Sequence, residues 1–501
     1  VSDKSCKIND SPMERLTESD RCDLILEKSS LSPIQNFYNG QSIFVTGGTG
    51  FMGKILIEKL LRECPGISFI YMLVRPKKGK DMHQRIEELF DDPVLFNKLK
   101  EKHPKFRYQI VAIAGDCVQP GLGLSSADRQ MITREVSIVF HVAATVRFDE
   151  KMKLAVPINV RSPKEMIDLC KEISYLKSFV HVSTAYANCP HDLIEEKIYE
   201  APMDANKLVT IIDYMDDKLV EDITPKLLGA WPNTYTFTKA IAESVIVKEA
   251  GELPIGIFRP AIVISTYREP VQGWIDNLYG PTGVAAGAGT GILRSIHCDG
   301  SIQANVVPGD LAVNALIVSA WDVADRRNKK EKNDIPVYNY VSKDNPITYD
   351  ELKVLSEKYG LEFPTSRAMW YYSFRNNKYK IIHLIYVYLL HLLPALLIDT
   401  VMICLGKQPR RMLKVYKKIH KFMSVINYFT VKEWKFANDN VKVLINKLSE
   451  EDRENFACDI TQVDWDHYFR TYVRGLRIYL IKDSLDTLPQ ARIKWQSLRI
   501  K

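Results

Sequence analysis

Tyr235 and Lys239 stand four residues apart at the start of a stretch whose apolar spacing predicts a helix over Phe237–Glu249. Residues i and i+4 share one face of a helix, so the phenol and the ammonium would face the same space. A free tyrosine has a pKa near ~10 and is a poor acid or base at neutral pH. A nearby ammonium favours the phenolate and lowers that pKa, which would suit Tyr235 to acid–base work. The pair alone is a weak signal, and an ordinary helix face is the alternative.

A glycine-rich turn separates the short apolar run Ile43–Val45 from a helical pattern over Lys54–Arg62. Its spacing suits a pyrophosphate, because glycine allows a tight turn, close approach of the backbone and close packing of helix on strand. The phosphates would lie at the helix N-terminus, where N–H groups lack partners. A plain tight turn is the alternative. The candidate cofactor-binding residues of this turn are Thr46, Gly47, Gly48, Thr49, Gly50, Phe51, Met52 and Gly53.

The glycine spacing G-x-x-G-x-x-G resembles that of the short-chain dehydrogenase/reductase superfamily. In folds of this kind, the end of the second strand decides between the two nicotinamide nucleotides. Here the run Phe69–Val74 is followed by Arg75, about 20 residues after Gly53, as expected for such a residue. An acid would bind the ribose 2′-hydroxyl of NAD, whereas an arginine suits the 2′-phosphate of NADP. Three cations and no carboxylate stand here, so the sequence favours NADPH. A solvated basic loop is the alternative for Arg75, and the preferred reading for Lys77 and Lys78.

The superfamily resemblance implies further cofactor contacts. Asp116 follows the expected strand Tyr108–Ile113 and matches an acid that contacts the adenine, although a turn or cap carboxylate is the alternative. Ala143 and Ala144 match the small residues that lie under the cofactor. His141, just before them, is expected in the core and without a catalytic role.

The same resemblance implies the remaining catalytic residues. Thr184 matches the hydroxyl that holds the reacting oxygen, with Ser183 as second choice, and either could instead cap the following turn. Lys239 would also bond to the nicotinamide ribose. Together these residues describe hydride transfer to a carbonyl carbon, with the hydride from NADPH and the proton from Tyr235. No cysteine nucleophile is required, because a thioester carbonyl accepts hydride directly.

Alternating strands and helices must position these residues. This alternation favours an α/β fold with a doubly wound, Rossmann-like parallel sheet covered by helices on both faces. A mainly helical C-terminal region follows. The expected strands are Ile43–Val45, Phe69–Val74, Tyr108–Ile113, Ser137–Val142, Ser178–Ser183, Ile255–Phe258 and, after a charged loop over Arg326–Asp334, Asp334–Ser342. The expected helices of this part are Lys54–Arg62, Met82–Leu89, Ser126–Arg134, Val160–Lys171 and Phe237–Glu249.

The composition excludes several classes of protein. The chain has 501 residues, of which 46% are hydrophobic and 26% charged, so it is neither wholly disordered nor a polytopic transporter. The net charge of +7 is moderate and no basic recognition motif is present, so nucleic acid is not an expected partner. Nine cysteines without a C-x-x-C pair indicate neither a disulfide framework nor a metal site, and favour reduced thiols facing the cytosol.

Longer segments resemble the alcohol-forming fatty acyl-CoA reductases of eukaryotes, and among these the insect type. The resemblance implies that a fatty acyl-CoA takes one hydride and releases CoA to give an aldehyde, which a second NADPH reduces to a primary alcohol. The sharpest matches are Gly273–Asn277, Gly280–Gly283 and the pattern His391-x-x-Pro394-Ala395 with Asp399. The broader ones are Phe37–Gly40, Thr46–Gly53, Leu73–Pro76, Gly115-Asp116, His141–Asp149, His181–Asn188, Tyr235–Lys239 and Phe258–Pro260.

The run Ile381–Gly406 is apolar and long enough to span about 30 Å of hydrocarbon. Its polar members weigh against a simple span: Pro394, Asp399, His383 and His391. A span, a broken helix pair dipping into the cytosolic leaflet and a buried core pair all remain open. Cations flank both ends, so orientation is not indicated. They are Lys378 and Lys380 before the run, and Lys407, Arg410, Arg411, Lys414, Lys417, Lys418 and Lys421 after it.

We therefore expect four parts: a flexible leader over 1–35, a catalytic reductase domain over 36–360, a helical domain over 361–483 and a tail over 484–501. Fatty acyl-CoA and membrane lipid are the expected partners, and no oligomeric state is indicated. We expect membrane association facing the cytosol, at the endoplasmic reticulum or the peroxisome. The rival readings are another extended short-chain dehydrogenase, of sugar-nucleotide or sterol type, and a nucleotide-sensing scaffold.

Overall fold

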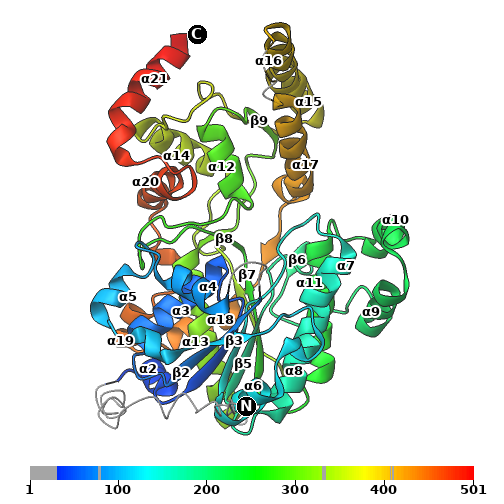
Figure 1. The fold of residues 1–501 in the computed structure, drawn as a ribbon, viewed down its shortest axis with the longest axis vertical. Coiled ribbons are helices and arrows are strands. Elements are labelled where there is room, and N and C mark those ends of the chain that lie inside the picture. The colour runs from blue at the N-terminus through cyan, green and yellow to red at the C-terminus, as the bar shows by residue number, and fades with distance from the viewer. Residues whose placement is uncertain (1–30, 77–80, 330–333, 407, 409–410, 501) are drawn as a thin grey trace, which may run out of the picture.

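A seven-stranded parallel sheet lies at the centre of the molecule (Figure 1). The computed structural model describes residues 31–76, 81–329, 334–406, 408 and 411–500. In space the strands follow the order β11-β7-β5-β4-β1-β2-β3. Their bounds are β1 (Ser42–Thr46), β2 (Phe69–Val74), β3 (Ile110–Ala114), β4 (Ile138–His141), β5 (Ser178–Val182), β7 (Ile255–Pro260) and β11 (Val337–Tyr340).

The strand order reverses beside β1. The chain runs outward from β1 through β2 to β3, then returns to β4 on the other side of β1. Such a reversal leaves a crevice at the carboxyl ends of the two strands, and ligands of doubly wound folds bind there. Thr46 ends β1 beside His141, which ends β4. The expected site segments therefore meet at one edge of the sheet.

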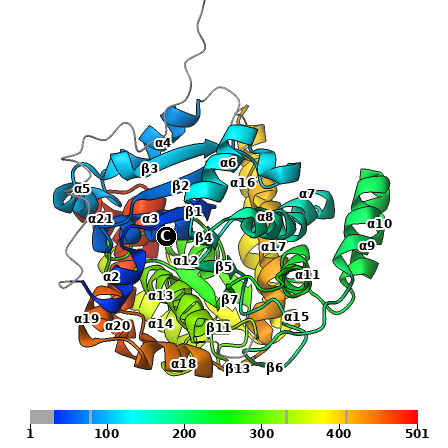
Figure 2. The same ribbon diagram turned by 90° about the horizontal axis from the view of Figure 1, so that it is seen from below.

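Helices cover both faces of the sheet (Figure 2). Side chains alternate along a strand, so Ile43 and Val45 join one core cluster and Phe44 joins the other. The first face packs against α3 (Phe51–Glu63) and α13 (Gly309–Asn328). The second packs against α6 (Ser126–Glu135), α8 (Ser162–Glu172) and α11 (Thr234–Glu249). The predicted doubly wound fold is confirmed.

A second, mainly helical layer stands above the carboxyl ends of the strands (Figure 1). It contains two short parallel pairs, β8 (Ile262–Ile264) with β10 (Val306–Pro308) and β9 (Ser295–His297) with β12 (Arg375–Asn377). Its helices include α12 (Pro281–Gly289), α14 (Tyr349–Glu362), α17 (Met412–Val431), α20 (Trp465–Gly475) and α21 (Leu488–Ile500).

The apolar run forms one continuous helix, Lys380–Cys404. It comprises α15 (Lys380–Tyr386), a π-helical turn (Val387–Leu392) and α16 (Leu393–Cys404), and it packs beside α17 in a hairpin that projects from the body (Figure 1). The π-helical turn directly precedes Pro394, where a proline removes one helical hydrogen bond. The expectation of a buried core pair is wrong for this segment, because only 17% of its most apolar window is buried inside the protein.

Several predicted boundaries differ from the structure. The expected leader ends too late, because Ser32 and Gln35 form a capping box that starts α2 (Pro33–Tyr38), with Ile34 buried. The charged loop expected from Arg326 begins too early, because α13 continues through Asn328. This long buried helix was not predicted. Residues 1–30 of the leader, and Lys77, Lys78, Lys407 and Arg410, lie outside the described residues.

The division at residue 360 falls inside α14. Segments from both sides of that position pair with each other, as β12 does with β9 and β13 (Lys435–Phe436) with β6 (Leu193–Ile194). The expected tail contains α21, whose Ala491 is fully buried. The two-domain organisation stays a prediction, and the two parts share one continuous core cluster.

Candidate active site

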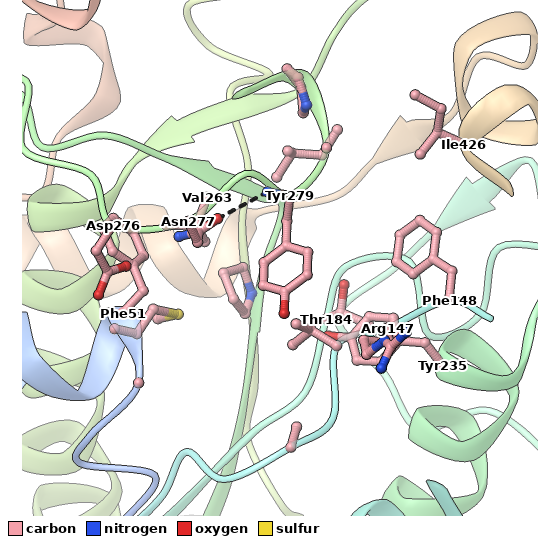
Figure 3. A pocket seen from close by; sticks show the side chains of 18 of the residues that line it. Phe51, Arg147, Phe148, Thr184, Tyr235, Val263, Asp276, Asn277, Tyr279 and Ile426 are labelled. Carbon is pink, nitrogen blue, oxygen red and sulfur yellow. Dashed lines mark hydrogen bonds between the residues drawn. The ribbon is translucent and has the colours of Figure 1, made fainter. Parts of the chain in front are cut away.

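A cavity of about 910 Å³ lies above the carboxyl ends of the strands. In Figure 3, Tyr235, Thr184, Arg147 and Phe148 gather on one side of it, while Phe51 and Asp276 lie opposite. The cavity is bounded below by the glycine turn and the ends of the central strands, and above by the helical layer. Nearly all candidate residues of the sequence therefore meet around one space.

The glycine turn forms a cradle that side chains would fill. Gly47 has φ +74°, and a β-carbon there would lie 2.6 Å from the backbone nitrogen of Ala143. A β-carbon on Gly53 would lie 2.2 Å from the Gly47 carbonyl oxygen. No side chain caps the first N–H groups of α3, which therefore remain available to an anion beside Gly50. The cavity wall includes these glycines and their neighbours Thr49, Phe51, Met52, Ala143 and Ala144.

Thr46 and Gly48 shape the turn and do not line the cavity. The Thr46 hydroxyl lies 2.7 Å from Nδ1 of His141 and accepts the backbone N–H of Ala143 at 3.3 Å. Gly48 packs against Met72 and Ile57, and a β-carbon would lie less than 3 Å from each side chain. Both residues hold the backbone of the turn in place, and their predicted contact with a cofactor stays a prediction.

Two arginines, Arg75 and Arg85, line the cavity near the end of β2. Arg75 is exposed there, and its carbonyl accepts a hydrogen bond from the guanidinium of Arg85, which lines the same wall. Asp116 also lines this end, and its carboxylate accepts the backbone N–H of Val118 at 3.1 Å. The sequence did not single out Arg85, because nothing local places it beside Arg75.

Helix α11 presents Tyr235, Lys239 and Glu243 at successive i+4 positions. Asn233 caps the helix by accepting the N–H of Thr236, which sets its first turn beside the end of β5. The Lys239 ammonium donates to the Val182 carbonyl at 2.7 Å. Burial lowers the pKa of Lys239 to about 8, and the Glu243 carboxylate acts in the opposite direction.

Tyr235 keeps its proton in this environment. Burial raises its pKa to about 12, and a hydrogen bond with Thr184 opposes that shift. The net shift is opposite to the predicted lowering, because desolvation of Tyr235 dominates and the Lys239 ammonium bonds to Val182, and the tuning role of Lys239 stays a prediction. Phe148 stacks on the Tyr235 ring, with centroids 5.7 Å apart and planes 15° apart. The phenol is thus protonated and held beside the Thr184 hydroxyl.

Ser183 hydrogen-bonds to a buried ion pair. Its hydroxyl donates to Glu243 at 2.6 Å, and Glu243 also accepts from both Nε (2.8 Å) and Nη2 (2.7 Å) of Arg259. Arg259 and Glu243 are almost completely buried. Because the single Ser183 proton is used here, Thr184 is the hydroxyl left to face the cavity. Glu243 was missed, although its i+4 spacing from Lys239 was the available signal.

The core position expected for His141 is confirmed. His141 is buried, and desolvation lowers its pKa to about 3, so it stays neutral. Tyr186 packs edge-on against Phe429, Trp434 and Phe436. Among the residues that the structure describes, no group of three or more histidine, cysteine, aspartate or glutamate side chains could hold a metal ion.

The run Gly273–Asn277 packs against the glycine turn and the start of α3. Trp274 is buried and stacks on Phe51, with ring centroids 5.4 Å apart. Asp276 accepts from Lys54 of the first α3 turns at 2.8 Å. Gly273 has φ +73°, and a β-carbon there would lie 2.2 Å from the Thr471 carbonyl oxygen of α20. The run therefore connects the glycine turn to the C-terminal helices.

Comparison with known proteins identifies the family. Residues 45–316 match the NAD-binding model of the male sterility proteins, and residues 390–483 match a second model with the same description. The fatty acyl-CoA reductase wat of Drosophila melanogaster is 46% identical over 482 residues, which cover 96% of this chain and 92% of that protein. The chain belongs to the fatty acyl-CoA reductase family. The predicted resemblance is confirmed.

Other members and solved structures agree. Fatty acyl-CoA reductase 1 of Homo sapiens is 39% identical over 472 residues, covering 93% of this reductase and 90% of that protein. The reductase domain of a non-ribosomal peptide synthetase from Mycobacterium tuberculosis matches the fold, with a TM-score of 0.57 at 20% identity over 93% of this chain and 97% of that one. The family model and these relatives establish a reductase with a nicotinamide cofactor.

Proposed function

We propose that this reductase converts long-chain fatty acyl-CoA to the primary alcohol with NADPH, at one site. The observation that carries the proposal is the arrangement of Tyr235 and Thr184 beside Ala143, on the same cavity as the glycine cradle. Family membership supplies the substrate class, since the relatives are named for fatty acyl-CoA. A bound reduced nicotinamide would supply hydride to the substrate carbonyl carbon.

The cradle would hold the pyrophosphate, and the arginine pair would select the nucleotide. Arg75 and Arg85 bring two cations to the end of β2, and the nearest carboxylate of the wall, Asp116, already accepts a backbone N–H. A 2′-phosphate is an anion that guanidinium groups bind well. The pair therefore supports NADPH over NADH. Lys239 lines the cavity from α11, where its ammonium is held at the end of β5 by the Val182 carbonyl, and it would bind the nicotinamide ribose.

The chain's own groups supply the acid chemistry. The Thr184 hydroxyl would hold the substrate oxygen, and Tyr235 would donate its proton to that oxygen as negative charge develops there. A pKa near 12 keeps the phenol protonated at neutral pH, which suits a proton donor. The Lys239 ammonium, held by Val182, would supply the positive field for the phenolate that remains.

One site can serve both reductions because both act on a carbonyl. The first hydride converts the thioester to a hemithioacetal, which expels the CoA thiol and leaves the aldehyde. The second hydride reduces the aldehyde to the alcohol. A covalent thioester on the enzyme is not required. Cys117 and Cys298 line the cavity, but burial raises the pKa of both thiols, so neither is a thiolate at neutral pH.

Helix Lys380–Cys404 would rest in the membrane interface. Val387, His391, Ala395 and Asp399 recur at i+4 and are buried against the protein, whereas the opposite face exposes leucine, isoleucine and valine. The Asp399 carboxylate caps α17 by accepting the N–H groups of Met412 (3.0 Å) and Leu413 (3.1 Å). The polar residues that weigh against membrane contact thus face the body, and the apolar face remains for lipid.

The hairpin favours an interfacial helix over a span. Helix α17, which packs beside α16 in the hairpin, carries exposed lysines. Placing these lysines in hydrocarbon would have a large free-energy cost. At the surface they suit an anionic leaflet. An anionic leaflet is typical of the cytosolic side, so we propose that the active site faces the cytosol, and the endoplasmic reticulum or peroxisome stays the expected organelle. These lysines are Lys414, Lys417, Lys418 and Lys421.

Product analysis tests the activity. The purified full chain is incubated with palmitoyl-CoA and either NADPH or NADH, and the lipids are identified by mass spectrometry. We expect hexadecanol and free CoA with NADPH, at two NADPH oxidised per alcohol. Accumulation of hexadecanal alone, or no oxidation of NADPH with any acyl-CoA, would contradict the proposal.

A further inference from the structure

The cavity continues beyond Tyr235 into the helical layer. Phe148, which stacks on Tyr235, contacts Phe429 at 5.3 Å between ring centroids. The Tyr349 hydroxyl donates to the Phe429 carbonyl at 3.2 Å, so the first residue of α14 is linked through Phe429 to the ring that stacks on Tyr235. Beyond it the wall is mostly apolar, with Leu352, Phe374, Ile426, Val473 and Leu476. We call this part of the cavity the upper arm.

Two helices set the length of the upper arm. Gly280, before α12, lies near Ile262 at the sheet edge, and Gly289 ends that helix about 14 Å further along its axis. Along α14, Gly360 lies about 16 Å from Tyr349. This length matches half of the roughly 30 Å hydrocarbon layer of a bilayer, which is the share of one acyl chain.

The far ends of both helices meet at the same place. Met369 donates its N–H to the carbonyl of Thr290, just after α12, at 2.9 Å. Lys494 of α21 donates to the Ser366 carbonyl at 2.7 Å, a few residues after α14. Trp495 of α21 is buried, lines the cavity and stacks at a tilt on Tyr371. The upper arm therefore ends beneath the indole of Trp495.

Gly289 and Gly360 line this arm without a packing reason to be glycine. A β-carbon added at either would meet no atom within 4 Å, and neither has a positive φ. Among the glycines that the structure describes, these are the two with both properties. Glycine costs helix stability relative to alanine, above all at Gly360 inside α14. The absence of side chains at these two positions therefore leaves open space in the cavity.

We propose that the upper arm holds the fatty acyl chain and that Gly289 and Gly360 set the longest chain accepted. The inference rests on the proposed acyl-CoA reductase activity. The distribution of charge agrees with this direction. Arg75, Arg85 and Arg147 line the lower part of the cavity, whereas within the described residues the upper arm has a single lining cation, Lys353 of α14. The phosphates of CoA would stay on the side of Arg147, and the chain would extend towards Trp495.

Chain-length profiles of two variants test the proposal. Gly289→Leu and Gly360→Leu should lower kcat/KM for palmitoyl-CoA by about tenfold or more, because each excluded methylene loses its burial. Octanoyl-CoA, which stops short of both positions, should be reduced within about twofold of the unmodified rate. Val354→Leu adds bulk to the exposed face of α14 outside the cavity and should leave both values unchanged.

The outcomes separate the inference from the activity on which it rests. If the unmodified chain reduces no acyl-CoA, the proposed function fails. If it reduces both substrates and the leucine variants keep its profile, the upper arm does not hold the chain. An equal loss for octanoyl-CoA and palmitoyl-CoA would mean that the arm holds the CoA moiety, which also overturns the proposal.

Two measurements do not depend on a folded leucine variant. Gly360→Ala should raise Tm, since alanine is the better helix former. The same variant should lower kcat/KM for the longest acyl chains. Palmitoyl-CoA with a diazirine at the chain terminus should, on irradiation with the unmodified chain, label peptides over 360–371 or the peptide of Trp495. Labelling confined to other segments, or a lower Tm for Gly360→Ala, would contradict the proposal.

Discussion

At the scale of single residues, burial decides the chemistry. Tyr235 and Lys239 form the pair that the sequence predicts, but their pKa values move in opposite directions, to about 12 and about 8, because each loses water around its charged form. The tyrosine therefore rests as an acid and the lysine rests near its titration point. A reduction needs a proton donor, so this resting state suits the proposed direction of reaction.

Lys239 should give the enzyme an alkaline limit. Its pKa is depressed, so the ammonium is present below about pH 8 and is lost as pH rises through that value. If the charge supports proton donation, kcat/KM for a fatty aldehyde should fall about tenfold per pH unit above pH 8. Lys239→Arg keeps its charge at all these pH values, so any activity it retains should lack this limit. A profile flat to pH 10 in the unmodified enzyme would contradict the role.

Arg75 and Arg85 should determine nucleotide choice. Removing one charge-assisted contact to the 2′-phosphate costs about 1.5–3 kcal/mol. Arg75→Ala should thus raise KM for NADPH roughly 10- to 100-fold and leave KM for NADH nearly unchanged. Arg107→Ala is the matched control, because Arg107 pairs with Glu87 and Asp91 outside the cavity. Equal use of both nucleotides by the unmodified enzyme would exclude this assignment.

At the scale of elements, the helix Lys380–Cys404 reverses the usual pattern. A surface helix normally buries apolar residues and exposes polar ones. Here His391 and Asp399 face the protein, whereas Leu389 and Leu396 are 54% and 51% exposed. The sequence predicted an apolar segment but not its orientation, because the partners of the polar residues lie on α17 and near β9.

Charges on the apolar face should detach the protein from lipid. Leu389→Glu with Leu396→Glu should move most of the protein from the vesicle pellet to the supernatant when anionic vesicles are sedimented. Val443→Glu, on the exposed surface of α18 (Asp439–Asn446), is the control and should still bind. Replacing Lys414, Lys417 and Lys418 by glutamine should weaken binding by about 1 kcal/mol per charge. An unmodified chain that ignores vesicles without detergent would refute membrane contact.

At the scale of the whole molecule, local patterns predict the sheet, the glycine turn and the catalytic helix, because each depends on residues close in sequence. The residues that sequence missed depend on distant packing. Arg85 donates to the carbonyl of Arg75, which stands ten residues earlier in the chain, Glu243 pairs with Arg259 of another element, and Trp495 lines the cavity from α21. The long helix α13 was missed because it is buried on nearly all sides, polar residues such as Asp310, Asn314 and Asp322 included, so its sequence carries no clear amphipathic period.

The most direct test of the account is Tyr235→Phe, which removes the phenolic oxygen and leaves the ring stacked on Phe148. NADPH oxidation is measured separately with palmitoyl-CoA and with hexadecanal, and NADPH binding by fluorescence. We predict nearly unchanged binding and a loss of turnover of about 10²-fold or more on both substrates, since one acid serves both steps. Full activity on palmitoyl-CoA, or loss of the aldehyde step alone, would contradict a single site with Tyr235 as its proton donor.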